Sequence, residues 1–156
     1  MLNRREFMKL SLGTGALVAA VPAMAGAMAT SGVAPIKISV YKSPSCGCCG
    51  EWVKHMQANG FDVQVIPMED VSSVARASGV PNKLGSCHTA LVGAYVIEGH
   101  VPADLVKKIL NEKPKILGLS VPGMVDGPPG MNENLKKPYD VIAFDRAGKT
   151  SVYAHR

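Results

Sequence analysis

The stretch 36-IKISVYKSPSCGCC-49 combines an alternating strand pattern, a turn and three of the chain's four cysteines. Apolar and polar residues alternate over Ile36–Tyr41, which is typical of a β-strand. Ser43-Pro44-Ser45 predicts a turn. The apolar positions that follow have the i, i+3, i+4, i+7 spacing of one buried helical face: Cys49, Trp52, Val53 and Met56. The stretch therefore predicts a strand–turn–helix unit with Cys46-Gly47-Cys48-Cys49 where the helix begins.

The rest of the chain alternates in the same way between strand and helix patterns. These patterns predict a strand over Phe61–Ile66, a helix over Val71–Ala77, a hairpin over His88–Glu98, a helix over Pro102–Glu112, and a closing hairpin from Asp140–Phe144 and Thr150–Ala154. Residues 114–138 are rich in Pro, Gly and Met and lack periodicity. This order predicts an α/β, thioredoxin-like fold with an added C-terminal β-hairpin and a Pro/Gly/Met-rich loop. Cys46 and Cys49 would occupy the redox position of that fold.

The N-terminus has the organisation of an export signal. Arg4-Arg5 precedes the apolar run Leu10–Val21, and Ala23-Met24-Ala25 follows as a small-residue cleavage site. The run is shorter than the roughly 18 residues that a membrane-spanning helix needs, which favours cleavage over a membrane anchor. We therefore predict a twin-arginine-type signal peptide over residues 1–25, a linker over 26–35, a single domain over 36–156 and a periplasmic location.

The charge pattern excludes some classes of partner. Removing residues 1–25 lowers the formal net charge from +5 to +3. The remaining lysines are scattered and only 5% of the residues are aromatic, so we expect no nucleic-acid binding. After signal cleavage we also expect no membrane association.

The cysteines allow two kinds of chemistry. Disulfide exchange of the thioredoxin type needs only Cys46 and Cys49 and leaves Cys48 without a role, whereas thiolate ligation of a soft ion such as Cu(I) uses all three. Cys87-His88 occupies the loop that usually carries a cis-proline in thioredoxin-like folds, and it adds a sulfur and an imidazole. The alternative is a disulfide from Cys87 to Cys46 or Cys49, as expected in an oxidising compartment. The loop substitution and His88 favour metal binding.

Further soft or imidazole ligands follow in loops. His100 lies in a predicted turn, where a histidine is a ligand or a surface residue with similar frequency. His55 is predicted to be a surface residue. Met124 and Met131 each end a Pro-Gly-Met unit, and their thioethers either pack against the domain or bind Cu(I).

These motifs together identify the chain as similar to the CopG-like family of exported bacterial copper-resistance proteins. The resemblance rests on Tyr41–Cys49, Trp52 to Met56, Gly79-Val80-Pro81, Ser86–Ala90, Glu98–Ala103, Leu119–Met124 and Gly130-Met131. It implies a thioredoxin-like fold and a cysteine-bridged cluster of copper ions. It also implies Cys46, Cys48, Cys49 and Cys87 as sulfur ligands, with an imidazole from His88 or His100.

The leading hypothesis is a periplasmic copper-binding protein that confers copper tolerance, holds several Cu(I) ions and passes them to an efflux or carrier protein. Zinc remains an alternative ion, because thiolate-rich sites bind it readily. One rival hypothesis is an enzyme that uses Cys46 and Cys49, either a thiol–disulfide oxidoreductase or a copper oxidase. Another is a structural domain with two disulfides. The leading hypothesis assigns no catalytic residue.

Overall fold

A computed structural model describes residues 34–156 of the chain. The predicted signal peptide and all but the last two residues of the predicted linker lie outside the described residues. Among the described helices, none combines the length and apolar character needed to cross a membrane.

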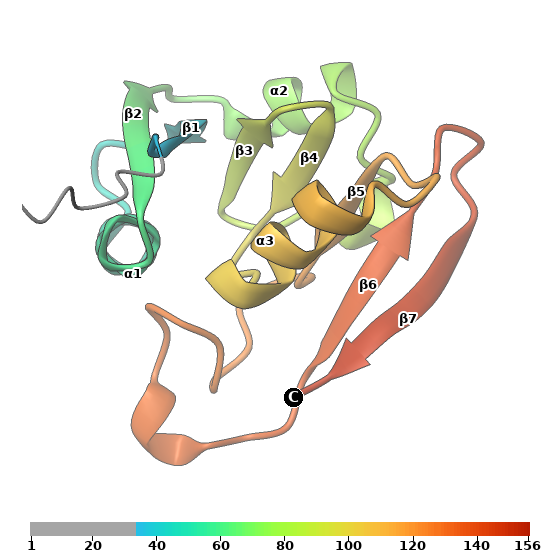
Figure 1. Ribbon diagram of the computed structural model, residues 1–156. Helices are drawn as coiled ribbons and strands as arrows, with labels where there is room; N and C mark the ends of the chain where they lie inside the picture. Colours follow the sequence, from blue (N-terminus) through green and yellow to red (C-terminus); the bar gives the residue numbers. More distant parts are fainter. Residues whose placement is uncertain (1–33) are drawn as a thin grey trace, which may run out of the picture. The chain divides into compact units, whose positions relative to one another are not determined.

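Within residues 34–156 the fold is a mixed α/β arrangement of seven strands and three α-helices (Figure 1). In chain order the elements are β1 (Ile36–Lys42), α1 (Gly47–Ala58), β2 (Phe61–Pro67), α2 (Val71–Ala77), β3 (His88–Val92), β4 (Tyr95–Glu98), α3 (Ala103–Glu112), β5 (Gly118–Ser120), β6 (Asp140–Phe144) and β7 (Thr150–His155). Short 3₁₀ turns occupy Asn82–Leu84 and Glu133–Leu135. The predicted α/β class and the predicted elements are confirmed.

All seven strands form one sheet in the order β2-β1-β3-β4-β5-β6-β7. The pairs β1–β2 and β4–β5 are parallel, and the other pairs are antiparallel. The closing hairpin is therefore continuous with the main sheet through β5. Sequence periodicity missed β5, because a strand of three residues is too short to show an alternating pattern.

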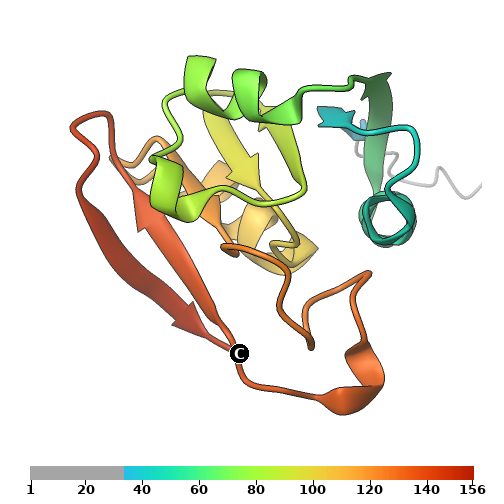
Figure 2. The same cartoon turned by 180° about the vertical axis from the view of Figure 1, so that it is seen from behind.

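The two faces of the sheet carry separate apolar clusters. On one face α1 and α3 pack against residues that include Ile38, Ala90 and Ile97. On the other face Ala75 of α2 packs with Val96 and Phe144. Because successive side chains of a strand point to opposite faces, the neighbours Val96 and Ile97 belong to different clusters. Figures 1 and 2 show α3 in front of the sheet in one view and α2 in front of it in the other.

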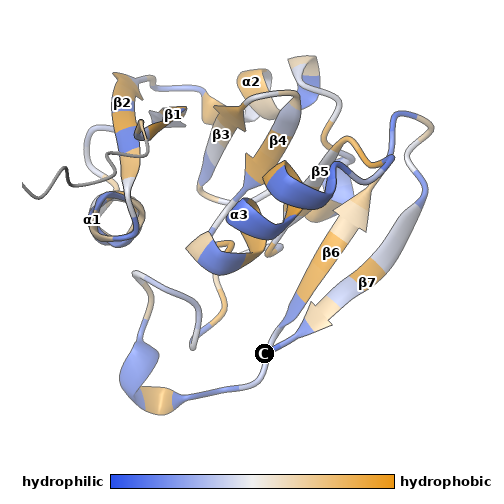
Figure 3. Cartoon of the chain, viewed as in Figure 1, coloured by the Kyte–Doolittle hydropathy of each residue, from blue (hydrophilic) through white to orange (hydrophobic). Residues whose placement is uncertain are grey.

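Helices α1 and α3 have the amphipathic patterns that the sequence predicts. The buried residues of α1 are Cys49, Trp52, Val53 and Met56, as expected from their spacing. In α3, Leu105 and Ile109 are buried, and Figure 3 shows hydrophilic residues along the side turned away from the sheet.

His55 is half-buried and links α1 to α3, a contact that the prediction of a surface residue does not include. Its Nε2 accepts a hydrogen bond of 3.1 Å from the backbone N–H of Ala103, the first residue of α3. Backbone N–H groups in the first turn of a helix have no partner within the helix, and His55 satisfies one of them. The contact lies 48 residues away along the chain, so no local pattern indicates it.

We expect Gly118→Ala to destabilise the fold, because β5 approaches its neighbours closely at this position. A Cβ atom on Gly118 would lie 2.7 Å from Cζ of Phe144 and closer still to the carbonyl oxygen of Val96. We expect a loss of about 2–4 kcal/mol in the free energy of unfolding, measured by urea denaturation followed by circular dichroism.

Gly50→Ala is the matched control for this variant. No heavy atom lies within 4 Å of a Cβ placed on Gly50, which is inside α1. Alanine is favoured over glycine in a helix by about 0.8–1 kcal/mol, so this variant should be as stable as the wild type or more so. An unchanged midpoint for Gly118→Ala would show that β5 is not packed as described.

Candidate metal centre

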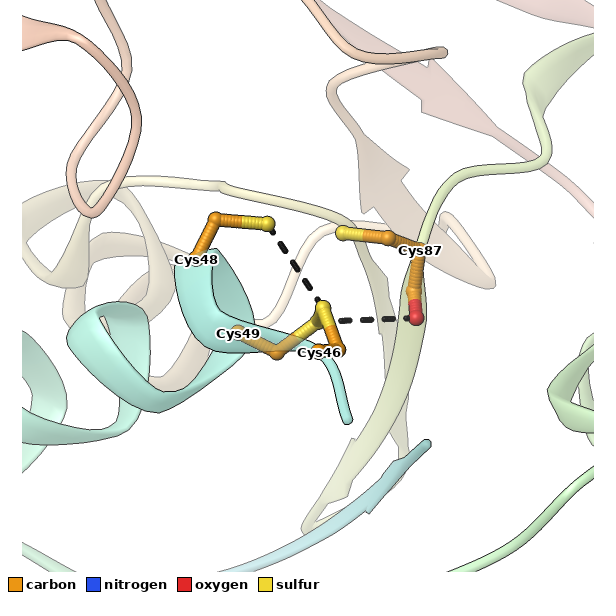
Figure 4. A group of neighbouring side chains, drawn as sticks. All are labelled: Cys46, Cys48, Cys49 and Cys87. Atoms are coloured by element: carbon orange, nitrogen blue, oxygen red, sulfur yellow. Dashed lines mark hydrogen bonds between the residues drawn. A yellow bond between two sulfur atoms is a disulfide. The ribbon is translucent and has the colours of Figure 1, made fainter. Parts of the chain in front are cut away.

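The fold brings all four cysteines together. Cys46 immediately precedes α1, and Cys48 and Cys49 lie in its first turn. Lys42 at the end of β1 pairs with His88 at the start of β3, so Cys87 arrives next to the beginning of α1. The four sulfurs all lie within 4.8 Å of one another (Figure 4).

In this structure the cluster holds one disulfide and two thiols. Cys46 and Cys49 are bonded with a Cα–Cα distance of 5.4 Å, while Cys48 and Cys87 are free. The alternative pairing of Cys87 with Cys46 or Cys49 is therefore wrong for this state. The second disulfide required by the structural-domain hypothesis is also not formed. The Sγ of Cys48 lies 3.5 Å from the Sγ of Cys46, so the spare thiol remains in contact with the bonded pair.

The Cys87 thiol is protonated at neutral pH. Burial raises its pKa to about 12, and the neighbouring Cys48 adds to the rise. A metal ion that binds this sulfur must displace its proton, so ion uptake is coupled to proton release.

His100 faces the Cys87 sulfur with a defined tautomer. Its Nδ1 lies 2.7 Å from the carbonyl oxygen of Pro129, and its Nε2 lies 3.1 Å from the Sγ of Cys87. Because a carbonyl oxygen only accepts hydrogen bonds, Nδ1 carries the proton and Nε2 presents a lone pair to the sulfur. A backbone carbonyl that orients a histidine in this way is common around metal-binding imidazoles. His100 is only 2% exposed, so the reading as a surface residue is wrong.

His88 is a second buried imidazole of the site. Its Nδ1 lies 3.4 Å from the Sγ of Cys87, and its ring centroid lies 4.4 Å from that of Trp52. Burial lowers its pKa to about 3, so it is neutral at physiological pH. Its Nε2 is buried with no hydrogen-bond partner among the described residues. Cys87, His88 and His100 therefore form a second group of potential ligand atoms within 4.8 Å of one another.

The Pro/Gly/Met-rich loop packs against the first turns of α1. A Cβ atom on Gly130 would lie 2.6 Å from the backbone nitrogen of Trp52 and 2.9 Å from the carbonyl oxygen of Cys48. The backbone N–H of Gly130 donates to the carboxylate of Glu133 over 2.8 Å. This packing of the loop against α1 places the neighbouring Pro129 carbonyl oxygen where it accepts the hydrogen bond from Nδ1 of His100.

The two predicted methionine ligands lie in turns whose glycines are held next to the site by hydrogen bonds or close packing. Gly123, which precedes Met124, donates its N–H to the carbonyl of Gly85 and accepts from the Ser86 hydroxyl. Met131 directly follows Gly130. Met124 is 61% exposed and Met131 is partly buried. Their role as ligands remains a prediction.

Glu98 is a residue of the site that sequence reasoning missed. Its two carboxylate oxygens accept hydrogen bonds of 2.7 Å from the backbone N–H of Ser86 and from the Thr89 hydroxyl. Burial raises the pKa of this carboxyl, and the two donated hydrogen bonds oppose the rise. The apolar residues Tyr95-Val96-Ile97 before it indicate only a strand, so its partners appear only in the folded structure.

Two solved structures are similar to this chain over most of its length. They are "Copper resistance protein copG- Form 1" and "Copper resistance protein copG- Form 2", each 41% identical to the chain with a TM-score of 0.73. Each match covers 78% of this chain and 98% of the solved one. The chain belongs to the CopG-like family.

The other comparisons are narrower. Residues 84–131 of this CopG-like protein match a family described as "Protein of unknown function, DUF411". That segment contains Cys87, His88, His100, Met124 and Met131 but not the cysteines of α1. No functionally curated protein matches this CopG-like chain.

We expect Cys87 to react slowly with iodoacetamide while the protein is folded. In the Cys48→Ser variant it is the only free thiol, provided that the Cys46–Cys49 disulfide stays intact. In the wild type a pKa of about 12, against an ordinary 9.0, corresponds to roughly a thousandfold less thiolate at a given pH below 9. In Cys48→Ser the contribution of Cys48 to this rise is lost, while the larger contribution from burial remains. The greater nucleophilicity of the more basic thiolate offsets part of this deficit, so labelling near pH 8 should be at least about tenfold slower than in urea.

Mass spectrometry of timed samples measures the labelling rate, and the rate should rise as the pH is increased towards the raised pKa. The same variant unfolded in urea is the control. Equal rates in the folded and unfolded protein would contradict the burial of Cys87.

Proposed function

We propose that this protein binds copper as Cu(I) in a cysteine-bridged cluster of several ions and contributes to copper tolerance. The ligands are Cys46, Cys48, Cys49 and Cys87, with an imidazole from His100 or His88. The observation that carries the proposal is the convergence of four sulfurs within 4.8 Å of one another beside the oriented Nε2 of His100. Thiolate sulfur with imidazole nitrogen is a donor set that suits Cu(I), and bridging sulfurs allow few ligands to serve several ions.

The position of the cluster also supports a thioredoxin-like fold. The strand order β2-β1-β3-β4, with β1 parallel to β2 and antiparallel to β3, accompanies α1 and α3 on one face and α2 on the other. In such a fold the cysteines before and within the first turn of α1 occupy the redox position. Unpaired N–H groups at that helix end favour thiolates, which are also the form that binds metal.

Binding by all four sulfurs requires reduction of the Cys46–Cys49 disulfide. A dithiol reductant supplies the two electrons and two protons that convert the disulfide to two thiols and is itself oxidised to a disulfide, and the bound ions then replace thiol protons. The oxidised state described above offers only the free sulfurs of Cys48 and Cys87. Zinc competes for the same thiolates, so both metals must be measured.

The predicted signal peptide supports a periplasmic site of action, and a twin-arginine route would export the protein in its folded state. A copper-binding protein in that compartment would pass its ions to an efflux or carrier protein.

A thiol–disulfide oxidoreductase, or a copper oxidase, is the second candidate. The observation that favours it is the Cys46–Cys49 disulfide at the start of a helix. Disulfide exchange would need only these two residues, whereas the copper cluster needs Cys48 as well.

Cys48→Ser separates the two candidates. Under reducing conditions we expect the variant to bind at least one copper ion fewer per protein than the wild type, because a bridging sulfur is lost. Disulfide exchange through Cys46 and Cys49 should persist. The measurement is the copper-to-protein ratio after Cu(I) loading and desalting, with zinc determined in parallel.

Ser45→Ala is the control, because it changes the turn before α1 without removing a sulfur. Full copper stoichiometry in Cys48→Ser would rule out the cluster, and loss of all exchange activity would show that Cys48 takes part in the redox chemistry.

We also propose that Met124 and Met131 bind Cu(I) at the edge of the cluster and assist its transfer. Replacing both with leucine preserves size and apolar character but removes the thioethers. We expect a transfer rate to a high-affinity chelator at least about threefold lower, with little change in stoichiometry. Met68→Leu, outside the Pro-Gly-Met units, is the control. Transfer at the wild-type rate in the double variant would exclude this role.

A further inference from the structure

Glu98 makes two short hydrogen bonds on either side of the Cys87-His88 pair. Its carboxylate is fully buried and accepts from the Ser86 N–H and from the Thr89 hydroxyl, each over 2.7 Å. Ser86 directly precedes Cys87, and Thr89 directly follows His88. One rigid group therefore holds both ends of the dipeptide that carries the Cys87 thiol and the His88 imidazole.

The same residue belongs to the segment that carries the second imidazole. Glu98 ends β4, where it pairs with Thr89 of β3, and His100 follows two residues later. The N–H of the intervening Gly99 donates to the carbonyl of His88 over 2.9 Å. The Glu98 side chain thus fixes the Cys87-His88 segment relative to the Glu98–His100 segment.

Gly99 makes this close approach possible. A Cβ atom there would lie 2.6 Å from the carbonyl oxygen of Val121 and would also overlap the Ser86 hydroxyl. Gly99 has a φ of 68°, a backbone conformation that glycine adopts without strain. The two segments are therefore held at close range by the backbone hydrogen bond from Gly99 and by the two hydrogen bonds of the Glu98 side chain.

We propose that Glu98 is a positioning residue that sets the distance between the Cys87 sulfur and His100 Nε2, and thereby the affinity of the site for copper. The proposal rests on the copper-binding function proposed above. A buried carboxylate has a large desolvation cost, so an apolar side chain would suit this strand end better if only stability mattered. The two hydrogen bonds to residues adjacent to ligands give the carboxylate its specific role, in the way that outer hydrogen bonds orient metal ligands elsewhere.

Three variants distinguish positioning from general stability. Glu98→Leu removes both hydrogen bonds. Glu98→Gln can keep both, because the amide oxygen accepts from Ser86 and the amide N–H₂ donates to the Thr89 hydroxyl. Val96→Ala changes the residue two positions before Glu98 on the same face of β4. It opens a cavity in the cluster around Ala75 and Phe144 and lowers stability, but it removes neither hydrogen bond of Glu98 nor any candidate ligand.

The first readout is Cu(I) affinity, measured by competition with a chromogenic chelator on reduced, folded protein. We expect Glu98→Leu to bind Cu(I) about 10- to 100-fold more weakly, with Glu98→Gln and Val96→Ala within about threefold of the wild type. The proposal is overturned if Glu98→Leu keeps the wild-type affinity, or if Val96→Ala, at a comparable loss of melting temperature, loses as much affinity.

The second readout uses metal-free protein and does not depend on copper binding. The side-chain ¹⁵N resonances of His100 report the contact of Nε2 with the Cys87 sulfur. We expect them to shift in Glu98→Leu and to remain in place in Glu98→Gln and Val96→Ala. An unshifted His100 in Glu98→Leu overturns the positioning role. A wild type that binds no copper, with His100 shifted in Glu98→Leu, would refute the copper function and leave the positioning intact.

Discussion

The geometry of the site depends on how Trp52 fixes α1 against the rest of the fold. Its indole N–H donates to the carbonyl of Val101 over 2.9 Å, and its ring packs on His88. Its backbone nitrogen lies where Gly130 approaches the helix. One fully buried side chain therefore holds the cysteine-bearing helix against the His88 strand and the segment that follows His100, while its backbone meets the Met131 loop. Loss of that packing would loosen the helix that carries Cys46, Cys48 and Cys49 from the segments that carry the histidine ligands.

The electrostatic state of the site follows from the same burial. Desolvation keeps the Cys87 thiol protonated and the His88 imidazole neutral, because it disfavours charge in either direction. His100 adds a neutral imidazole whose tautomer is fixed by the Pro129 carbonyl. The Cys87 thiol and the two imidazoles are thus neutral, and an entering cation supplies the charge that makes ionisation of the Cys87 sulfur favourable.

Local patterns predicted most of the secondary structure and the cysteine cluster, because they depend on residues close together in the chain. The spacing of the buried residues from Cys49 to Met56 predicts α1. The predicted start of this helix then places the three sulfurs of Cys46, Cys48 and Cys49. The burial of His100, the cap that His55 gives to α3, and the Glu98 contacts were not predicted. Each depends on a partner brought close only by the tertiary fold. Strand β5 was missed because three residues cannot establish a period, although pairing on both sides stabilises it.

The four sulfurs come from two segments, with Cys49 and Cys87 separated by 38 positions. Contacts within β1, α1 and β2 are local, whereas Cys87 joins them only after a long loop has closed and β3 has paired with β1. Cys46, Cys48 and Cys49 are therefore close to one another as soon as α1 forms, and a disulfide between Cys46 and Cys49 needs only this helix. The arrival of Cys87 requires the native sheet, so a complete four-sulfur site is a property of the finished fold and distinguishes a mature molecule from a folding intermediate.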